Sequence, residues 1–134
     1  MKHWLVKFAP FKVSWKDILL TGKFEIYGVT NLQAIIYLKR MKIGDKVLYY
    51  HSQVDRSIMG IMKVTEEAHQ DKTTADPQFV SVTFEPIHTF KNPIPLSYIK
   101  SIPALADISL IIQPKLAVME VSKEHFDILK STSN

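Results

Sequence analysis

Apolar and polar residues alternate in several short runs of the chain, which is the pattern of β-strands. Residues 2–8 alternate before Pro10, and residues 79–88 alternate until Pro86, which favours a strand end or an edge strand. Residues 46–51 place apolar side chains on both faces, as expected of a fully buried strand. Shorter apolar runs predict further strands or extended segments at 24–27, 58–64 and 116–121.

Capping residues mark the predicted helices. Ser14, with Asp17 three residues later, predicts the start of a short helix, and Gly22 predicts its end. Ser122 predicts the start of a last helix over residues 123–130, and residues 96–101 favour another short helix. The polar run 66–77 is interpreted as a loop, and residues 92–95 as an extended connector.

The stretch 28–52 is the predicted centre of the fold. Thr30 and Gln33 have the spacing of a capping box, which predicts a helix start. Gly44 suits the left-handed residue that ends a helix, and Asp45 suits the following turn. The helix between them has a broad apolar face made of Leu32, Ile35, Ile36 and Tyr37.

The strand after this helix delivers Tyr49, Tyr50, His51 and Ser52 to its end. Neighbouring residues of a strand face opposite sides, so at most one of the two tyrosines is expected to face a pocket. Gly60, in the next strand, predicts a bulge or a close backbone approach. Because strands and helices do not alternate regularly, we predict an α+β fold: a small barrel or bent sheet of five to six mostly antiparallel strands with short flanking helices.

Composition fits one globular domain. The chain has 134 residues, of which 46% are hydrophobic, so residues 1–134 are interpreted as a single domain with one core. It contains no cysteine, and its first residues do not resemble a signal peptide. No run approaches the roughly 20 apolar residues of a membrane helix. We therefore expect a cytoplasmic protein that does not bind a membrane.

The charge favours polyanions weakly. The net charge is +4 and the isoelectric point is near 9.2, so nucleic acid would be attracted in a salt-dependent way. Arg40 and Arg56 are the only arginines, and lysine attracts phosphate without the bidentate fork of arginine. A lysine-coated surface with no specific partner is the simpler interpretation.

The residues give little support for catalysis. The five histidines share no metal-ligand spacing, and there is no glycine-rich phosphate loop. His51 and Ser52 are adjacent in a strand and face opposite ways, so they do not form a nucleophile pair. We expect no metal, no cofactor and no enzymatic activity.

Several short motifs follow one another along almost the whole chain. They are W-L-V-K with a following proline at 4–10, G-V-x-N-x-Q-A at 28–34, M-K-x-G-D at 41–45, Y-H-S at 50–52, P-A-L-A-D at 103–107 and Q-x-x-L-x-V at 113–118. Their order and spacing resemble the EVE domain family, a PUA-like β-barrel group that includes the thymocyte nuclear proteins. Gly60 falls where this family has a G-I-x-x-V strand.

The chain departs from the family at polar positions. Phe8 and Ala9 stand where the family has serine and glutamate. Other family residues, which are charged, polar or aromatic, are replaced at Ile26, Tyr27, Thr30, Leu32, Ile35, Ile36 and Ile112, whereas Lys115 keeps a positive charge. These differences affect the expected ligand more than the expected fold.

The resemblance implies non-catalytic binding of nucleic acid, DNA or RNA, with a pocket for a modified base such as a methylated cytosine or adenine. A base removed from its stack needs aromatic faces and a few polar groups at its edge. The residues expected to bind are Trp4, Lys7, Gly28, Val29, Asn31, Gln33, Tyr50, His51, Ser52 and Lys115.

Each of these residues also has a structural interpretation. Trp4 can belong to the core, and Asn31 and Gln33 can serve the backbone at the helix start. His51 with Ser52 can close a turn, and the lysines can be solvated charges. Two alternatives therefore stay open: a closed pocket in a structural or protein-interaction module, and a small-metabolite pocket for a nucleoside-like ligand.

Overall fold

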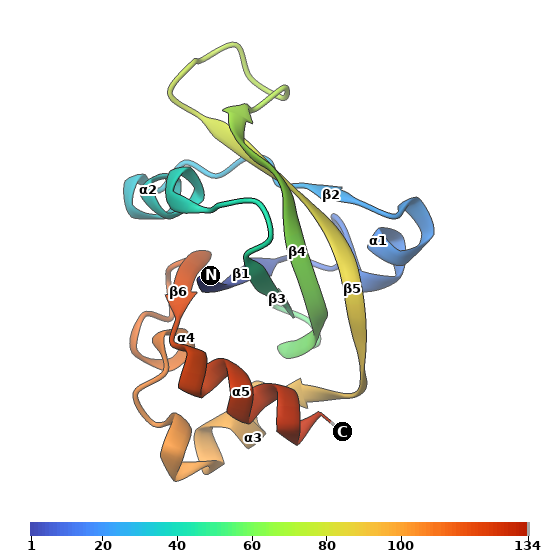
Figure 1. Ribbon diagram of the computed structural model, residues 1–134, viewed down its shortest axis with the longest axis vertical. Coiled ribbons are helices and arrows are strands. Elements are labelled where there is room, and N and C mark those ends of the chain that lie inside the picture. The colour runs from blue at the N-terminus through green and yellow to red at the C-terminus, as the bar shows by residue number, and fades with distance from the viewer. Residues whose placement is uncertain (134) are drawn as a thin grey trace.

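The computed structural model describes residues 1–133 and contains one bent, six-stranded sheet (Figure 1). The strand order is β2-β5-β4-β3-β1-β6. β1 and β3 are parallel, and the other neighbouring pairs are antiparallel. The strands are β1 (His3–Phe8), β2 (Phe24–Glu25), β3 (Lys46–His51), β4 (Ser57–Gln70), β5 (Val80–Pro95) and β6 (Val118–Val121).

The predicted α+β class with six mostly antiparallel strands is confirmed, but a closed barrel is not. β2 and β6 are the two edges of the sheet, and no strand pairing joins them within residues 1–133. The sheet curves chiefly through the long β4–β5 hairpin, where the strand register shifts at four places. Each shift leaves one or more extra residues on one of the two strands and bends them.

The β4–β5 hairpin is longer than the sequence pattern predicts. The strands extend to Gln70 and Pro95, so residues 66–70 of the predicted loop and the predicted connector 92–95 belong to strands, whereas residues 71–77 form a loop as predicted. Pro86 does not end its strand, but it lies beyond Thr83 and Phe84, the β5 residues that pair with β2, so within residues 1–133 the outer side of β5 is an edge there, as the second form of the prediction has it. A register shift between Ile61 and Met62 lies opposite Pro86, and this irregularity accommodates the missing amide donor.

Five α-helices and one 3₁₀ turn complete the fold. They are α1 (Trp15–Thr21), α2 (Leu32–Arg40), α3 (Leu96–Ser101), η1 (Pro103–Leu105), α4 (Ser109–Ile112) and α5 (Lys123–Thr132). In Figure 1, α1 and α2 flank opposite sides of the sheet, and α3 and α5 lie below it. No helix within residues 1–133 is long and apolar enough to cross a membrane.

Two helix starts follow the prediction closely. Ser14 and Asp17 form a reciprocal capping box at α1, and Gly22 ends the helix with φ +80°. The Ser122 hydroxyl accepts from the His125 amide at the start of α5. Local sequence therefore decides both ends of α1 and the start of α5.

The start of α2 differs from the prediction. Asn31, not Thr30, is the N-cap, and its Oδ1 accepts from the Ala34 amide at 3.0 Å. The buried face consists of Ala34, Ile35 and Leu38, whereas Leu32 is 70% exposed and Ile36 is 41% exposed. Asparagine is as good a cap as threonine, and spacing alone does not choose between them.

Gly44 is left-handed, as predicted, but does not end α2. The helix stops at Arg40 with Met41 as its cap, and Gly44, with φ +92°, belongs to the turn before β3. Its amide donates to the Val64 carbonyl at 2.9 Å, which attaches this turn to β4. The glycine thus serves the strand connection.

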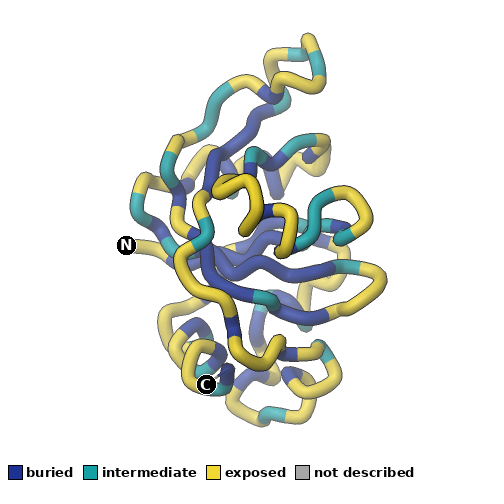
Figure 2. Tube along the Cα trace, turned by 90° about the vertical axis from the view of Figure 1, so that its right-hand side faces the viewer, coloured by how far each residue is buried: buried dark blue, intermediate teal, exposed yellow. Residues whose placement is uncertain are grey.

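The core lies against the strands, as the dark residues of Figure 2 show. Trp4 is 0% exposed, and its indole donates to Asp45 Oδ2 at 3.0 Å. Burial alone would raise the pKa of Asp45, but hydrogen bonds from Trp4, Lys42 and Lys2 outweigh burial and hold the pKa below its usual value. This buried carboxylate joins β1 to the turn before β3.

Gly60 is required by close packing, as predicted. A Cβ atom there would lie 2.5 Å from the His88 carbonyl oxygen and closer still to the indole ring of Trp15. The strand register also shifts next to it, between Tyr49 and Tyr50 of the paired strand. Trp15 is fixed from the other side, because its indole donates to Thr89 Oγ1 at 3.0 Å.

Candidate functional site

A cavity of about 210 Å³ opens where the end of β1 meets the loops that precede α2 and β6. The loop before β6 is attached to β1 because the Lys7 amide donates to the Ala117 carbonyl at 2.8 Å. The residues that line the cavity are Lys7, Phe8, Lys12, Ile26, Tyr27, Gly28, Val29, Thr30, Asn31, Ala34, Lys115 and Ala117. Its walls therefore combine aromatic, aliphatic and cationic side chains.

Two aromatic rings form part of the wall. Phe8 contacts Tyr27 edge to face, with 5.2 Å between ring centroids, and contacts Phe24 in the same way at 5.1 Å. Such contacts fix the orientation of the Phe8 ring. Neither Phe8 nor Tyr27 was predicted as a site residue, although each is next in sequence to one that was, Lys7 and Gly28.

Three lysines, Lys7, Lys12 and Lys115, surround the cavity. Lys7 Nζ donates to the Pro114 carbonyl at 2.6 Å, and burial lowers the pKa of Lys7. Within residues 1–133 none of the three forms an ion pair. The cavity is therefore electropositive and suits an anionic ligand.

The Gly28 turn is held by the distant β4–β5 hairpin. Gly28 has φ +72°, and its amide donates to Asp71 Oδ2 at 2.8 Å. Asp71 is 1% exposed and also accepts from the amide and hydroxyl of Thr73. Burial alone would raise the pKa of Asp71, but the hydrogen bonds from Thr73 and Gly28 outweigh it and lower the pKa. The carboxylate thus stays ionised and fixes one wall of the cavity.

Asn31 lines the cavity and caps α2 at the same time. Because Oδ1 accepts from the Ala34 amide, the Nδ2 group is the free end of the side chain. No hydrogen bond from Nδ2 occurs within the described chain. Asn31 can therefore offer a donor to a ligand while it stabilises the helix start.

Five of the ten residues expected to bind line this cavity: Lys7, Gly28, Val29, Asn31 and Lys115. They come from three segments that are far apart in sequence. The other five, Trp4, Gln33, Tyr50, His51 and Ser52, lie outside the lining. The expected recess at the end of β3 is thus displaced to the end of β1.

His51 and Ser52 serve the backbone rather than the cavity. His51 Nε2 accepts from the Trp15 amide at 2.8 Å, and Nδ1 lies 2.8 Å from Asp55 Oδ2. Since Nε2 accepts, the neutral ring carries its proton on Nδ1 and donates to Asp55. The Ser52 amide donates to the Phe8 carbonyl at 3.0 Å, so this pair closes the turn after β3.

The remaining three residues are also placed by structural roles. Trp4 belongs to the core, and Tyr50 is buried, with a pKa that burial raises. Gln33 is exposed, and the capping box expected with Thr30 does not form. Tyr49 likewise points away from the cavity, because its hydroxyl donates to the Val13 carbonyl at 2.6 Å.

The described residues contain no group of three or more His, Cys, Asp or Glu side chains that could hold a metal ion. The bent sheet and the basic, aromatic cavity define a small α+β domain with one candidate binding site at the end of β1. The chain belongs to the EVE domain family, because the sequence profile of that family matches residues 2–132.

Known relatives support this assignment. The chain is 27% identical to human thymocyte nuclear protein 1 over an alignment 163 positions long, which covers 96% of this chain and 72% of that protein. A crystal structure from Agrobacterium tumefaciens aligns with TM-score 0.97 at 31% identity, covering 100% of this chain and 94% of the other. The human THYN1 protein in complex with DNA containing 5-methylcytosine aligns with TM-score 0.93 at 26% identity, covering 100% and 98%.

Proposed function

We propose that this protein binds nucleic acid without catalysis, and that the cavity at the end of β1 accepts one modified base, with 5-methylcytosine in DNA as the first candidate. The observation that carries the proposal is the cavity itself, in which Phe8 and Tyr27 stand beside three lysines without ion pairs. A relative with the same fold has been captured with DNA of this kind.

The physical properties of the cavity fit a single base. A volume of about 210 Å³ is below the roughly 300–1,000 Å³ of sites for larger ligands, which suits a base better than a whole nucleotide. Tyr27 and Phe8 offer aromatic surface, and Asn31 offers a donor for a base edge. Ile26 and Val29 provide apolar surface against which a methyl group can pack.

The closed-pocket alternative is less well supported. Asn31 and His51 do turn toward backbone partners, and Phe8 and Ile26 do occupy the walls, as that alternative requires. A cavity nevertheless remains between them, and its cations are not neutralised by the described residues. A small-metabolite pocket in the same cavity is distinguished by competition with free nucleosides.

The test is a titration with oligonucleotides, single- and double-stranded, as DNA and RNA, with and without methylated bases, at low and moderate salt. We expect a preference for the methylated form of about fourfold, because burying one methyl group contributes about 0.8 kcal/mol. Tyr27→Ala should weaken binding by roughly 5- to 150-fold if a base stacks on the ring, since stacking contributes about 1–3 kcal/mol per base.

Two matched controls sharpen this titration. Tyr98→Ala is the control for Tyr27→Ala, because it removes an exposed tyrosine that does not line this cavity. Lys63→Gln is the control for Lys7→Gln, because it removes an exposed lysine outside the cavity. Binding of the wild type that equals that of a lysine-rich control protein would reject the proposal. Displacement of the oligonucleotide by free nucleosides at equal concentration would favour the small-metabolite alternative.

A further inference from the structure

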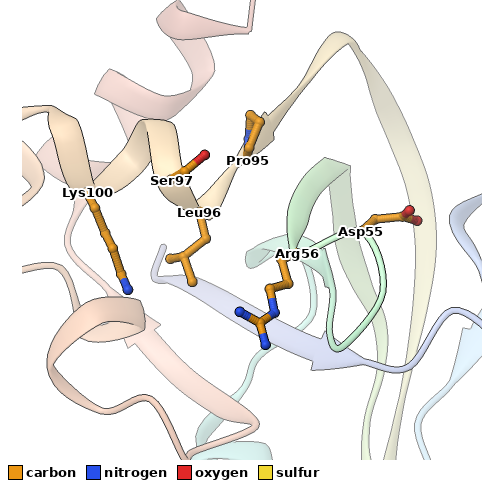
Figure 3. A pocket seen from close by; sticks show the side chains of 6 residues that line it. All are labelled: Asp55, Arg56, Pro95, Leu96, Ser97 and Lys100. Atoms are coloured by element: carbon orange, nitrogen blue, oxygen red, sulfur yellow. The ribbon is translucent and has the colours of Figure 1, made fainter.

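A second cavity, of about 260 Å³, lies between the β3–β4 turn and α3 (Figure 3). It is lined by Asp55 and Arg56 from the turn, and by Pro95, Leu96, Ser97 and Lys100 from the end of β5 and from α3. None of these residues lines the cavity at the end of β1. The second cavity is therefore a separate feature of the surface.

The cavity carries two cations that form no ion pair with the described residues. Arg56 and Lys100 come from segments 44 positions apart, and neither forms an ion pair within residues 1–133. The one carboxylate in the lining, Asp55, is 2.8 Å from His51 Nδ1. Figure 3 shows Asp55 pointing away from Arg56 and Lys100, which extend on the same side of the cavity. Two like charges held near one another favour a bound anion.

Arg56 is held in place by its backbone. Its φ of +47° is uncommon for a residue other than glycine, and such conformations persist where the surroundings impose them. The Arg56 carbonyl accepts from the Leu96 amide at 2.8 Å, and the next residue, Ser57, pairs with Pro95. The guanidinium is therefore presented from a fixed point beside α3.

Both cavities lie near the carboxyl-terminal ends of the neighbouring strands β1 and β3. β1 and β3 are parallel, with Phe8 opposite His51, and Arg56 follows five residues later. Adjacent strands are about 4.8 Å apart, and five extended residues reach at most about 17 Å, so Arg56 lies within roughly 22 Å of Phe8. At about 3.4 Å per nucleotide along one strand, about six nucleotides bridge this separation.

We propose that Arg56 and Lys100 form a phosphate-binding site for the backbone of a nucleic acid whose base occupies the cavity at the end of β1. The polymer ligand rests on the proposed function above, whereas the phosphate chemistry rests on the second cavity alone. Arginine offers a planar fork for two phosphate oxygens, lysine adds a point charge, and the Ser97 hydroxyl is a further donor in the lining.

The first experiment measures oligonucleotide binding against salt concentration for Arg56→Gln and Lys100→Gln, with Lys63→Gln as the charge-matched control. Each cavity variant should lower the slope of log K against log salt by about 0.7–0.9, the loss of one phosphate contact. The preference for a methylated base should stay unchanged, because the base cavity is intact. A salt slope in both variants equal to that of Lys63→Gln would overturn the phosphate site while leaving base binding intact.

The second experiment titrates the wild type with inorganic phosphate and follows amide chemical shifts, with sodium chloride at equal ionic strength as the control. Saturable shifts at Arg56, Ser97 and Lys100 are expected, and these should be lost in Arg56→Gln. If the wild type binds no oligonucleotide, these shifts still support a phosphate site and only the proposed function fails. Spectra that respond equally to phosphate and chloride would overturn the site in that case.

Discussion

At the residue scale, Gly60 lies directly beneath the indole ring of Trp15. The space for a Cβ atom is taken by that ring and by the His88 carbonyl. Trp15 in turn donates its indole N–H to Thr89 Oγ1, and its ring centroid lies 5.8 Å from that of Tyr49. One missing side chain thus allows α1 to contact the sheet.

Gly60→Ala should lower the free energy of unfolding by about 1–3 kcal/mol, because the added methyl overpacks this contact. Urea unfolding measures the loss, and tryptophan fluorescence should report a displaced Trp15. Gly22→Ala is the matched control: its φ is +80° but nothing lies within 4 Å of the added atom. It should cost about 1 kcal/mol from backbone conformation alone and leave the fluorescence unchanged. An equal fluorescence spectrum for both variants would contradict this account.

At the element scale, α2 shows how a cap also shapes a binding surface. Asn31 satisfies the Ala34 amide with one end of its side chain and faces the cavity with the other. The helix buries Ala34, Ile35 and Leu38 and leaves Leu32 and Ile36 to solvent. The position of the cap therefore determines both the buried face of the helix and the donors at the cavity.

Asn31→Ala should lower the free energy of unfolding by about 1 kcal/mol, since the Ala34 amide loses its acceptor. Thr30→Ala, one residue earlier, should change stability by no more than about 0.5 kcal/mol, because Thr30 is exposed and does not cap the helix. The two midpoints of urea unfolding decide between these positions. A larger loss of stability in Thr30→Ala than in Asn31→Ala would contradict this assignment and favour the Thr30 capping box that the sequence spacing predicts.

Patterns within a few residues predicted α1 correctly, whereas contacts between residues far apart in the chain could not be predicted from the sequence. Ser14, Asp17 and Gly22 define α1 through contacts within a few residues, so the prediction needs no tertiary information. The cavity depends on contacts such as Gly28 with Asp71 and Lys7 with Pro114, which are 43 and 107 positions apart. No local pattern reveals such pairs. This is why the sequence did not place Phe8 and Tyr27 in the cavity lining or Asp71 behind it, and why His51 was expected to face a pocket.

At the scale of the whole molecule, buried titratable groups link stability to pH. Asp45 and Asp71 are buried, and hydrogen bonds hold their pKa values below the ordinary value of 3.8 despite the opposing effect of burial. His3 is also buried, and burial lowers its pKa below 6.5. In each case the unfolded chain binds protons more readily than the folded protein.

Stability should therefore fall in two steps as the pH decreases. His3 contributes to the first step, which begins near pH 6.5, because its folded pKa is lower than its unfolded pKa. Asp45 and Asp71 contribute to the second step, which begins near pH 3.8 and continues through their folded pKa values. Urea midpoints at closely spaced pH values measure both steps. His3→Gln should reduce only the first, and a first step of unchanged size in that variant would contradict the assignment.

Asp71, one of the two carboxylates in the second pH step, also connects distant parts of the molecule. It lies in the β4–β5 hairpin and accepts a hydrogen bond from the Gly28 amide. Asp71→Asn removes the charge from three hydrogen bonds, and bonds to a charged group contribute about 1.5–3 kcal/mol each, compared with about 1 kcal/mol for neutral ones. We expect faster hydrogen exchange at the Gly28 amide, together with weaker binding of the methylated oligonucleotide, because one wall of the cavity loses its fixed position.

Asp76→Asn is the matched control for this prediction, because Asp76 lies in the same hairpin loop and its carboxylate accepts only from Gln78 among the described residues. It should leave both Gly28 exchange and oligonucleotide affinity unchanged. Faster exchange at Gly28 in Asp71→Asn without any loss of affinity would separate the turn from ligand binding. The aromatic ring of Tyr27, rather than the Gly28 backbone, would then be the part of this wall on which binding depends.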